Sequence, residues 1–110
     1  MTSVSTHILD TSVGRPAAGV AVHLSVRPGR DAPWTPHGTS TTDADGRCKD
    51  LPEPPEGTAH VRLDFAVEPY LARRGAFFPE VAVVFAVTPG EHHHVPLLLN
   101  PFGYSVYRGS

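Results

Sequence analysis

The chain has 110 residues and a mass of 11.8 kDa, which suits a single domain over residues 1–110 and is too small for two hydrophobic cores. Its 10 Gly and 12 Pro residues are too few for a low-complexity chain, and 40% of the residues are hydrophobic, so the chain is expected to fold. Nine Lys and Arg against 11 Asp and Glu give a net charge of −2 without any basic run, which argues against nucleic acid or a membrane as a partner.

Apolar residues recur at every second position in several segments, as they do in strands with one face in a core. The segments predicted to be strands are, in chain order, Thr6–Leu9, Val20–Val26, Thr39–Thr42, Arg47–Leu51, Ala59–Phe65, Phe77–Val87, Val95–Leu99 and Tyr104–Tyr107. Turn residues 100–103 separate the last two, which predicts a hairpin. The expected core includes Val20, Val22, Leu24, Val61, Leu63 and Phe65.

Only Glu68–Arg74 is predicted to be helical, with Pro69 in its first turn and Gly75 as the left-handed residue that follows its last turn. The Pro-rich stretches Arg27–Pro36 and Pro52–Gly57 are interpreted as loops within the domain, because neither flank is large enough to bury a core alone. Seven or eight strands and one short helix predict an all-β, antiparallel sandwich.

Seven histidines stand out, and three of them are consecutive. Successive strand side chains point to opposite faces, so His92 and His94 share one face while His93 lies on the other. They cannot all bind one ion, and no recognised metal motif accompanies them, so we predict no metal site. We interpret His92 and His93 as a polar strand end. His94 lies on a face with Pro96 and Leu98, where a histidine is more often structural than catalytic.

Other features indicate little by themselves. Cys48 has no partner for an internal disulfide, and the first residues have no signal-peptide pattern, so the expected location is the cytoplasm. The segment Tyr104–Ser110 carries two Tyr and an Arg, yet it also fits an ordinary edge strand with a frayed tail. Arg47, beside a turn, fits an exposed strand residue paired with Asp43 or Asp50.

Several segments together resemble the transthyretin-related 5-hydroxyisourate hydrolases over the whole chain. These segments are Ser5–Thr11, Gly14–Val20, Thr42–Arg47, Phe77–Val81, His94–Leu99 and Tyr107–Ser110. The Tyr-Arg-Gly-Ser sequence distinguishes the hydrolases from the hormone-carrying transthyretins. The chain departs from the family pattern at His93, where Tyr is common, and at Asn100, where Ser is common.

The resemblance implies a transthyretin-like sandwich of two four-stranded sheets, with a short helix between the fifth and sixth strands. It also implies a homotetramer with active sites in the channel between dimers, and no cofactor. The implied reaction is the hydrolysis of 5-hydroxyisourate to 2-oxo-4-hydroxy-4-carboxy-5-ureidoimidazoline in urate degradation.

The resemblance assigns the catalytic positions to His7, Arg47 and His94, and substrate binding to Tyr107, Arg108, Gly109 and Ser110. The two histidines form an acid/base pair whose individual roles stay open, and Arg47 polarises ring carbonyls. Two other classes remain as alternatives, namely a small-ligand carrier without catalysis and a monomeric structural module.

Overall fold

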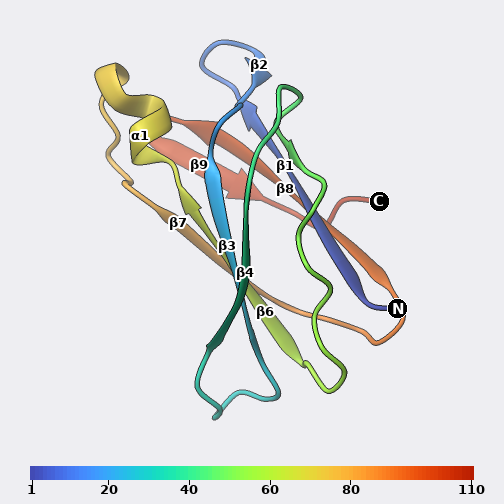
Figure 1. Cartoon of the computed structure of the whole chain (residues 1–110). Helices are drawn as coiled ribbons and strands as arrows, with labels where there is room; N and C mark the ends of the chain where they lie inside the picture. The colour runs from blue at the N-terminus through green and yellow to red at the C-terminus, as the bar shows by residue number, and fades with distance from the viewer.

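The computed structural model describes residues 1–110 as two β-sheets packed face to face, with a short helical segment at one end (Figure 1). The strands are β1 (Ser3–Asp10), β2 (Arg15–Pro16), β3 (Ala21–Arg27), β4 (Thr35–Thr41), β5 (Arg47–Cys48), β6 (His60–Ala66), β7 (Val81–Ala86), β8 (His92–Asn100) and β9 (Gly103–Val106). No helix is long and apolar enough to cross a membrane.

One sheet has the order β4-β3-β6-β7, and its strands are all antiparallel neighbours. The other has the order β2-β1-β8-β9, with β5 also paired to β1. Its five strands exceed the predicted four because the two-residue β2 folds back on the end of β1. The predicted hairpin of β8 and β9 is confirmed.

The prediction that all strands are antiparallel is wrong for one central pair, since β1 runs parallel to β8. Parallel strands need a long connection, and here the connection between them contains the entire second sheet. Alternation within each strand carries no information on the direction of a neighbour that lies almost 90 residues away.

Several strand boundaries differ from the prediction. β4 begins at Thr35, inside a stretch expected to be a loop, and β5 ends at Cys48. β7 begins only at Val81, because the preceding residues include Pro79, which cannot donate a ladder hydrogen bond, and the exposed Phe77. The six residues expected in the core are all at most 1% exposed, so the predicted interior is confirmed.

The predicted helix is present as α1 (Glu68–Leu71) followed by a 3₁₀ turn (Ala72–Arg74). Gly75 ends it with φ of 76°, the left-handed conformation expected there. The helical segment lies between β6 and β7, so it is flanked by the fifth and sixth strands when the short β2 is left out of the count.

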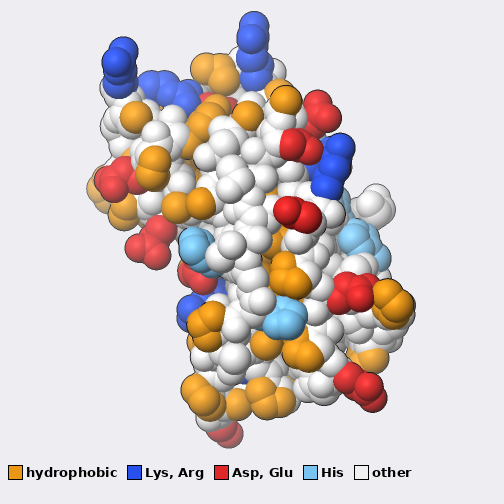
Figure 2. Space-filling view, viewed as in Figure 1, with side chains coloured by type: hydrophobic (Ala, Val, Ile, Leu, Met, Phe, Trp, Pro, Cys, Tyr) orange, Lys and Arg blue, Asp and Glu red, His pale blue; other side chains and the backbone are white.

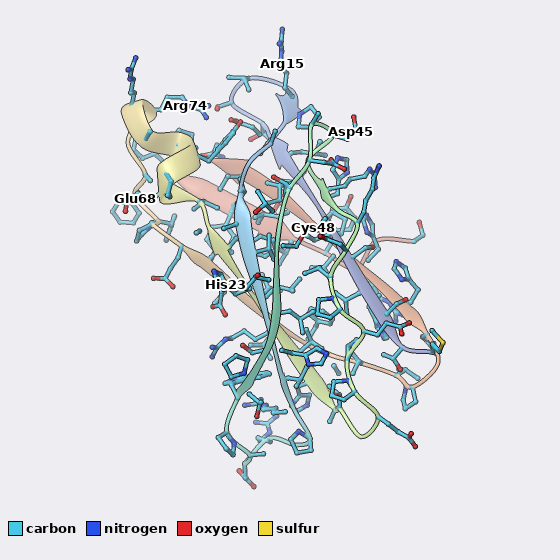
Figure 3. The ribbon with its side chains drawn as sticks, viewed as in Figure 1. Arg15, His23, Asp45, Cys48, Glu68 and Arg74 are labelled. Carbon is cyan, nitrogen blue, oxygen red and sulfur yellow. The ribbon has the colours of Figure 1, made fainter.

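A buried carboxylate ties the helical segment to the end of β1. Asp10 is fully buried, accepts hydrogen bonds from the Tyr70 hydroxyl (2.7 Å) and the Ser12 backbone N–H (3.0 Å), and pairs with Arg74 at 2.8 Å. Figure 3 shows Arg74 at the helical segment. Burial by itself raises the pKa of Asp10, but the hydrogen bonds from Ser12, Arg74 and Tyr70 outweigh it and lower the pKa from 3.8 to about 2.

Acid should therefore destabilise this anchor in a defined range. Because the pKa of Asp10 is lower in the folded chain, its contribution to stability is complete above pH 3.8 and is lost as the pH falls towards about 2. We expect Asp10→Asn to lower the free energy of unfolding by about 2 kcal/mol at pH 7 and to flatten the acid limb. Urea unfolding from pH 2 to pH 7 measures both effects, and an unchanged acid limb in Asp10→Asn would contradict this assignment.

Candidate active site

The outer face of the first sheet, away from the core, carries the ionisable side chains that the resemblance assigns to catalysis. On β1, alternate residues are buried from Val4 to Asp10, which leaves Ser5, His7 and Leu9 on the outer face. On β8, His93 is buried at 3% exposure, whereas His92 is exposed and His94 half-buried. The predicted faces of both strands are therefore confirmed.

Strand pairing brings the three predicted catalytic residues together on this face. The parallel register places Ser5 beside His94 and His7 beside Pro96. On the other side of β1, Arg47 of β5 pairs with His7. His7, Arg47 and His94 thus come from three neighbouring strands, although they are far apart in the sequence.

The surroundings of His94 favour its neutral form. Partial burial lowers the pKa of His94 below 6.5, and the positive charges of Arg47, His7 and His92 lower it further. The Ser5 hydroxyl lies 2.8 Å from Nδ1 of His94. Nε2 has no protein partner, and no buried side-chain nitrogen lacks one, so Nε2 is accessible from solvent. A neutral imidazole with an accessible nitrogen is a competent general base near neutral pH.

Arg47 is exposed and forms no ion pair within the chain. Its backbone N–H donates to the Asp43 carboxylate at 3.0 Å, as does the N–H of Asp45 at 2.9 Å, so the turn before β5 is fixed from within. These backbone hydrogen bonds, with the Arg47 N–H as the main cause, lower the pKa of Asp43. The guanidinium is left free for an external acceptor. Figure 2 shows cationic and anionic side chains interspersed on the visible face, without a continuous basic surface.

Near the end of the chain, Gly109 pairs with His94 in an antiparallel bridge. The N–H of Gly109 donates to the carbonyl oxygen of His94 at 2.7 Å. A Cβ at Gly109 would lie 2.6 Å from Cδ2 of the His94 ring, so only glycine fits against the imidazole without displacing it. Ser110, which follows, is exposed.

Tyr107 and Arg108 lie elsewhere in the isolated chain. They line a mainly apolar cavity of about 210 Å³ at the β7 edge of the sandwich, together with the inward-facing His93. Arg108 also pairs with Glu91 at 3.1 Å. One chain therefore brings Gly109, but neither Tyr107 nor Arg108, into contact with the catalytic candidates.

The sequence suggested that His93 belongs to a polar strand end, but in the structure this side chain is buried. Its Nε2 accepts a hydrogen bond from the Thr88 N–H at 3.0 Å, and its Nδ1 lies 3.2 Å from the Ser3 carbonyl oxygen. It is a buried structural residue that connects β8 to the segment before it and to β1. Sequence reasoning also missed Ser3 and Ser5, although period-two alternation alone places them on the face of His7.

The single cysteine and the remaining histidines do not suggest a second site of this kind. Cys48 is buried between the sheets (Figure 3), where burial raises the pKa of its thiol. No group of three or more His, Cys, Asp or Glu side chains is arranged to hold a metal ion.

Two packed sheets, a short helix and a His/Arg cluster on one outer sheet face define a transthyretin-like protein. Residues 4–109 match the HIUase/Transthyretin family. The chain belongs to this family. The uric acid degradation bifunctional protein TTL of Arabidopsis thaliana is 45% identical over 97% of this chain, which spans only 37% of the Arabidopsis protein.

A second relative matches more of its own length. The 5-hydroxyisourate hydrolase of Salmonella dublin is 44% identical over 97% of this chain and 80% of its own length. Among solved structures, the Klebsiella pneumoniae 5-hydroxyisourate hydrolase has a TM-score of 0.80 and 35% identity, with 97% of this chain and 98% of that chain covered. Sea bream transthyretin in complex with thyroxine has a TM-score of 0.85 and 31% identity, covering 96% and 93%. The fold thus agrees with both branches of the family.

Proposed function

We propose that this protein is a 5-hydroxyisourate hydrolase of urate degradation, in which residues 1–110 act as one domain. The observation that carries the proposal is the convergence of His7, Arg47 and His94 on one sheet face, with an accessible nitrogen on His94. The relatives from Salmonella and Klebsiella that carry this name are similar over nearly the whole chain. The substrate is a flat ring with several carbonyl acceptors, which suits a guanidinium without an internal partner.

In the proposed reaction, water attacks a ring carbonyl carbon while Nε2 of His94 takes its proton. We assign this role to His94 because its lowered pKa keeps the ring neutral at neutral pH. The guanidinium of Arg47 stabilises the negative charge that forms on the carbonyl oxygen. The carbon–nitrogen bond then breaks, and the leaving nitrogen takes a proton from His7. Ser5 bonds to His94, but no carboxylate bonds to His7 or His94, so the chain has no Ser-His-Asp arrangement and we assign water as the nucleophile.

We further propose that the active unit is a homotetramer in which a second dimer covers the outer face. The half-buried Leu9 and Leu98 lie on this face beside the histidines, and a partner would exclude water from both groups. In such an assembly, Tyr107, Arg108 and Ser110 of one chain would reach the active sites of neighbouring chains. Light scattering should give about four times the chain mass of 11.8 kDa. A mass near 11.8 kDa at micromolar concentration would contradict the tetramer.

The direct test follows the absorbance of freshly generated 5-hydroxyisourate, which should disappear faster with the protein than without it. The carrier alternative predicts saturable binding of an apolar ligand without turnover. Three ionisable side chains on the candidate face argue against it, since a carrier channel for an apolar ligand is expected to have few of them. Absence of turnover by the assembled protein would reject the hydrolase proposal.

Arg47→Lys provides a finer test, because it keeps the positive charge and removes the planar pair of donors. We expect kcat/KM for 5-hydroxyisourate to fall by about 10- to 100-fold, since a lysine cannot orient and polarise the ring in the same way. The melting temperature should change little because Arg47 is exposed and unpaired. Full activity of Arg47→Lys would show that charge alone suffices.

A further inference from the structure

Four side chains form a continuous hydrogen-bonded row on the outer face of β1 and β8. The Ser3 hydroxyl lies 2.6 Å from Nδ1 of His92, and Nε2 of the same ring lies 2.8 Å from the Ser5 hydroxyl. Ser5 is in turn 2.8 Å from Nδ1 of His94. The row begins at Ser3 and the exposed His92 and ends at the half-buried His94, so it connects solvent with the candidate base.

The donors and acceptors of these groups limit the directions in which the bonds of the row can run. A serine hydroxyl has one proton to donate, and a neutral imidazole has one donor and one acceptor nitrogen. Ser5 touches two rings and has one proton, so it can donate to only one of them; it then accepts from the other ring, or it accepts from both rings and donates to solvent. If it donates to His94, then His92 donates to Ser5 and Ser3 donates to His92. If His94 donates to Ser5 and Ser5 donates to His92, every bond is reversed.

These two arrangements differ at the nitrogen that faces the site. When Ser5 donates to Nδ1 of His94, the proton of that ring is on Nε2. When Nδ1 of His94 donates to Ser5, Nε2 has a free lone pair and can accept a proton from water. The direction of the row therefore determines whether neutral His94 is a base or an acid towards the site.

We propose that Ser5 and His92 are positioning residues that hold His94 in its base form and conduct the proton it gains to solvent. The inference rests on the proposed hydrolase function, because a proton has to be carried away from His94 only if His94 takes one from water. Ser3 is the last member of the row before solvent.

The proton balance is complete within the row. Nε2 of His94 gains the proton of the attacking water, and its Nδ1 proton passes to the Ser5 oxygen. The Ser5 proton passes to Nε2 of His92, whose Nδ1 proton passes to Ser3, which releases its own proton to bulk water. One proton enters and one leaves, every member ends neutral, and His94 carries its proton on Nε2. Once the product has left, a proton returns from solvent along the reversed row to Nδ1 of His94 while the Nε2 proton is lost to water in the open site, which restores the base form.

The charges around His94 explain why such a row is useful. Arg47 on β5 disfavours a second positive charge on this ring, and so do His7 on β1 and His92 on β8 whenever either is protonated at both nitrogens. No carboxylate bonds to either imidazole, and the nearby Glu91 is paired with Arg108. A His94 that kept the proton would be an uncompensated imidazolium beside a guanidinium, so export of a proton removes an electrostatic cost.

The first test reads the rings directly and does not depend on hydrolysis. Imidazole ¹⁵N spectra at pH 7.5 report which nitrogen carries the proton, and His94→Asn identifies the His94 signals by their loss. In Ser5→Ala the His94 signals should move towards those of a free imidazole, and in Ser5→Thr, which restores the hydroxyl, they should return. Spectra of His94 that are identical in the parent and Ser5→Ala would overturn the inference.

The second test separates proton transfer from mere support of the ring. His92→Gln keeps a hydrogen-bonding amide near Ser5 but cannot pass a proton through itself. We expect kcat to fall about tenfold or more in Ser5→Ala and His92→Gln with KM changed less than about twofold, because proton transfer and not binding is impaired. Ser5→Thr should recover most of kcat. Thr39→Ala, which removes an exposed hydroxyl from the other sheet, is the matched control and should retain full activity.

The outcomes distinguish this inference from the proposed function. If the parent protein does not hydrolyse 5-hydroxyisourate, the hydrolase proposal fails, and the ¹⁵N spectra still decide whether Ser5 controls the His94 ring. If the parent is active while His92→Gln retains its kcat and its pH profile, the relay is wrong although the hydrolase proposal stands.

Discussion

His94→Asn should reduce the hydrolysis of 5-hydroxyisourate by about two to four orders of magnitude, the range that general acid–base catalysis usually supplies. The loss should appear in kcat, because His94 acts on the attacking water and contributes little to binding of the ring. In the parent, the acid limb of the pH profile should lie below pH 6.5, since partial burial and the charges of Arg47, His7 and His92 lower the pKa of His94. Stopped-flow absorbance from pH 5 to pH 8 measures both effects.

The neighbouring histidine provides the control. Sequence alternation predicts that His93→Ala is nearly silent in catalysis. The structure adds that this change leaves the Thr88 N–H and the Ser3 carbonyl oxygen without the part-buried ring to which they bond. We expect nearly normal kcat at 15 °C with a free energy of unfolding lowered by about 1–3 kcal/mol. If His93→Ala impaired kcat as severely as His94→Asn in folded protein, the assignment of the β8 faces to catalysis and core would be wrong.

Deletion of Tyr107–Ser110 should abolish most of the activity while leaving the sandwich folded. The deleted residues contribute nothing to the 18-residue core, yet they include the Gly109 N–H that bonds to His94. Loss of this contact frees the chain around the catalytic ring, and loss of Tyr107 and Arg108 removes an aromatic and a cationic group from the assembly. Circular dichroism, light scattering and turnover of the same sample measure fold, assembly and activity.

Gly109→Ala isolates one part of this effect without shortening the chain. The added methyl group would lie 2.6 Å from Cδ2 of His94, so either the ring or the last residues must move. We expect a clear loss of kcat with little change in melting temperature, because Gly109 lies outside the core. A truncated protein that is folded, tetrameric and fully active would remove Tyr107–Ser110 from the proposed site.

Local sequence patterns are sufficient to predict much of the fold and part of the candidate site. Alternation within a strand depends only on the two-residue period of the extended backbone, and it correctly separated His94 from His93 and placed Val20 and Phe65 in the core. Gly75 likewise marked the end of the helical segment, because a left-handed residue there favours glycine. The functional assignment of His7 and Arg47 came from resemblance, since each has an ordinary structural explanation when considered alone.

The tertiary structure decided everything that depends on two distant segments. The parallel register of β1 and β8 sets Ser5 between two histidines almost 90 residues away, and a shift by one residue would turn Ser5 to the opposite face. The tertiary structure also places Tyr107 and Arg108 at an apolar cavity and not beside His94, although the family resemblance assigns all three residues to one site. Register and strand direction are selected by burial of whole faces across both sheets, so no local pattern along a single strand determines them.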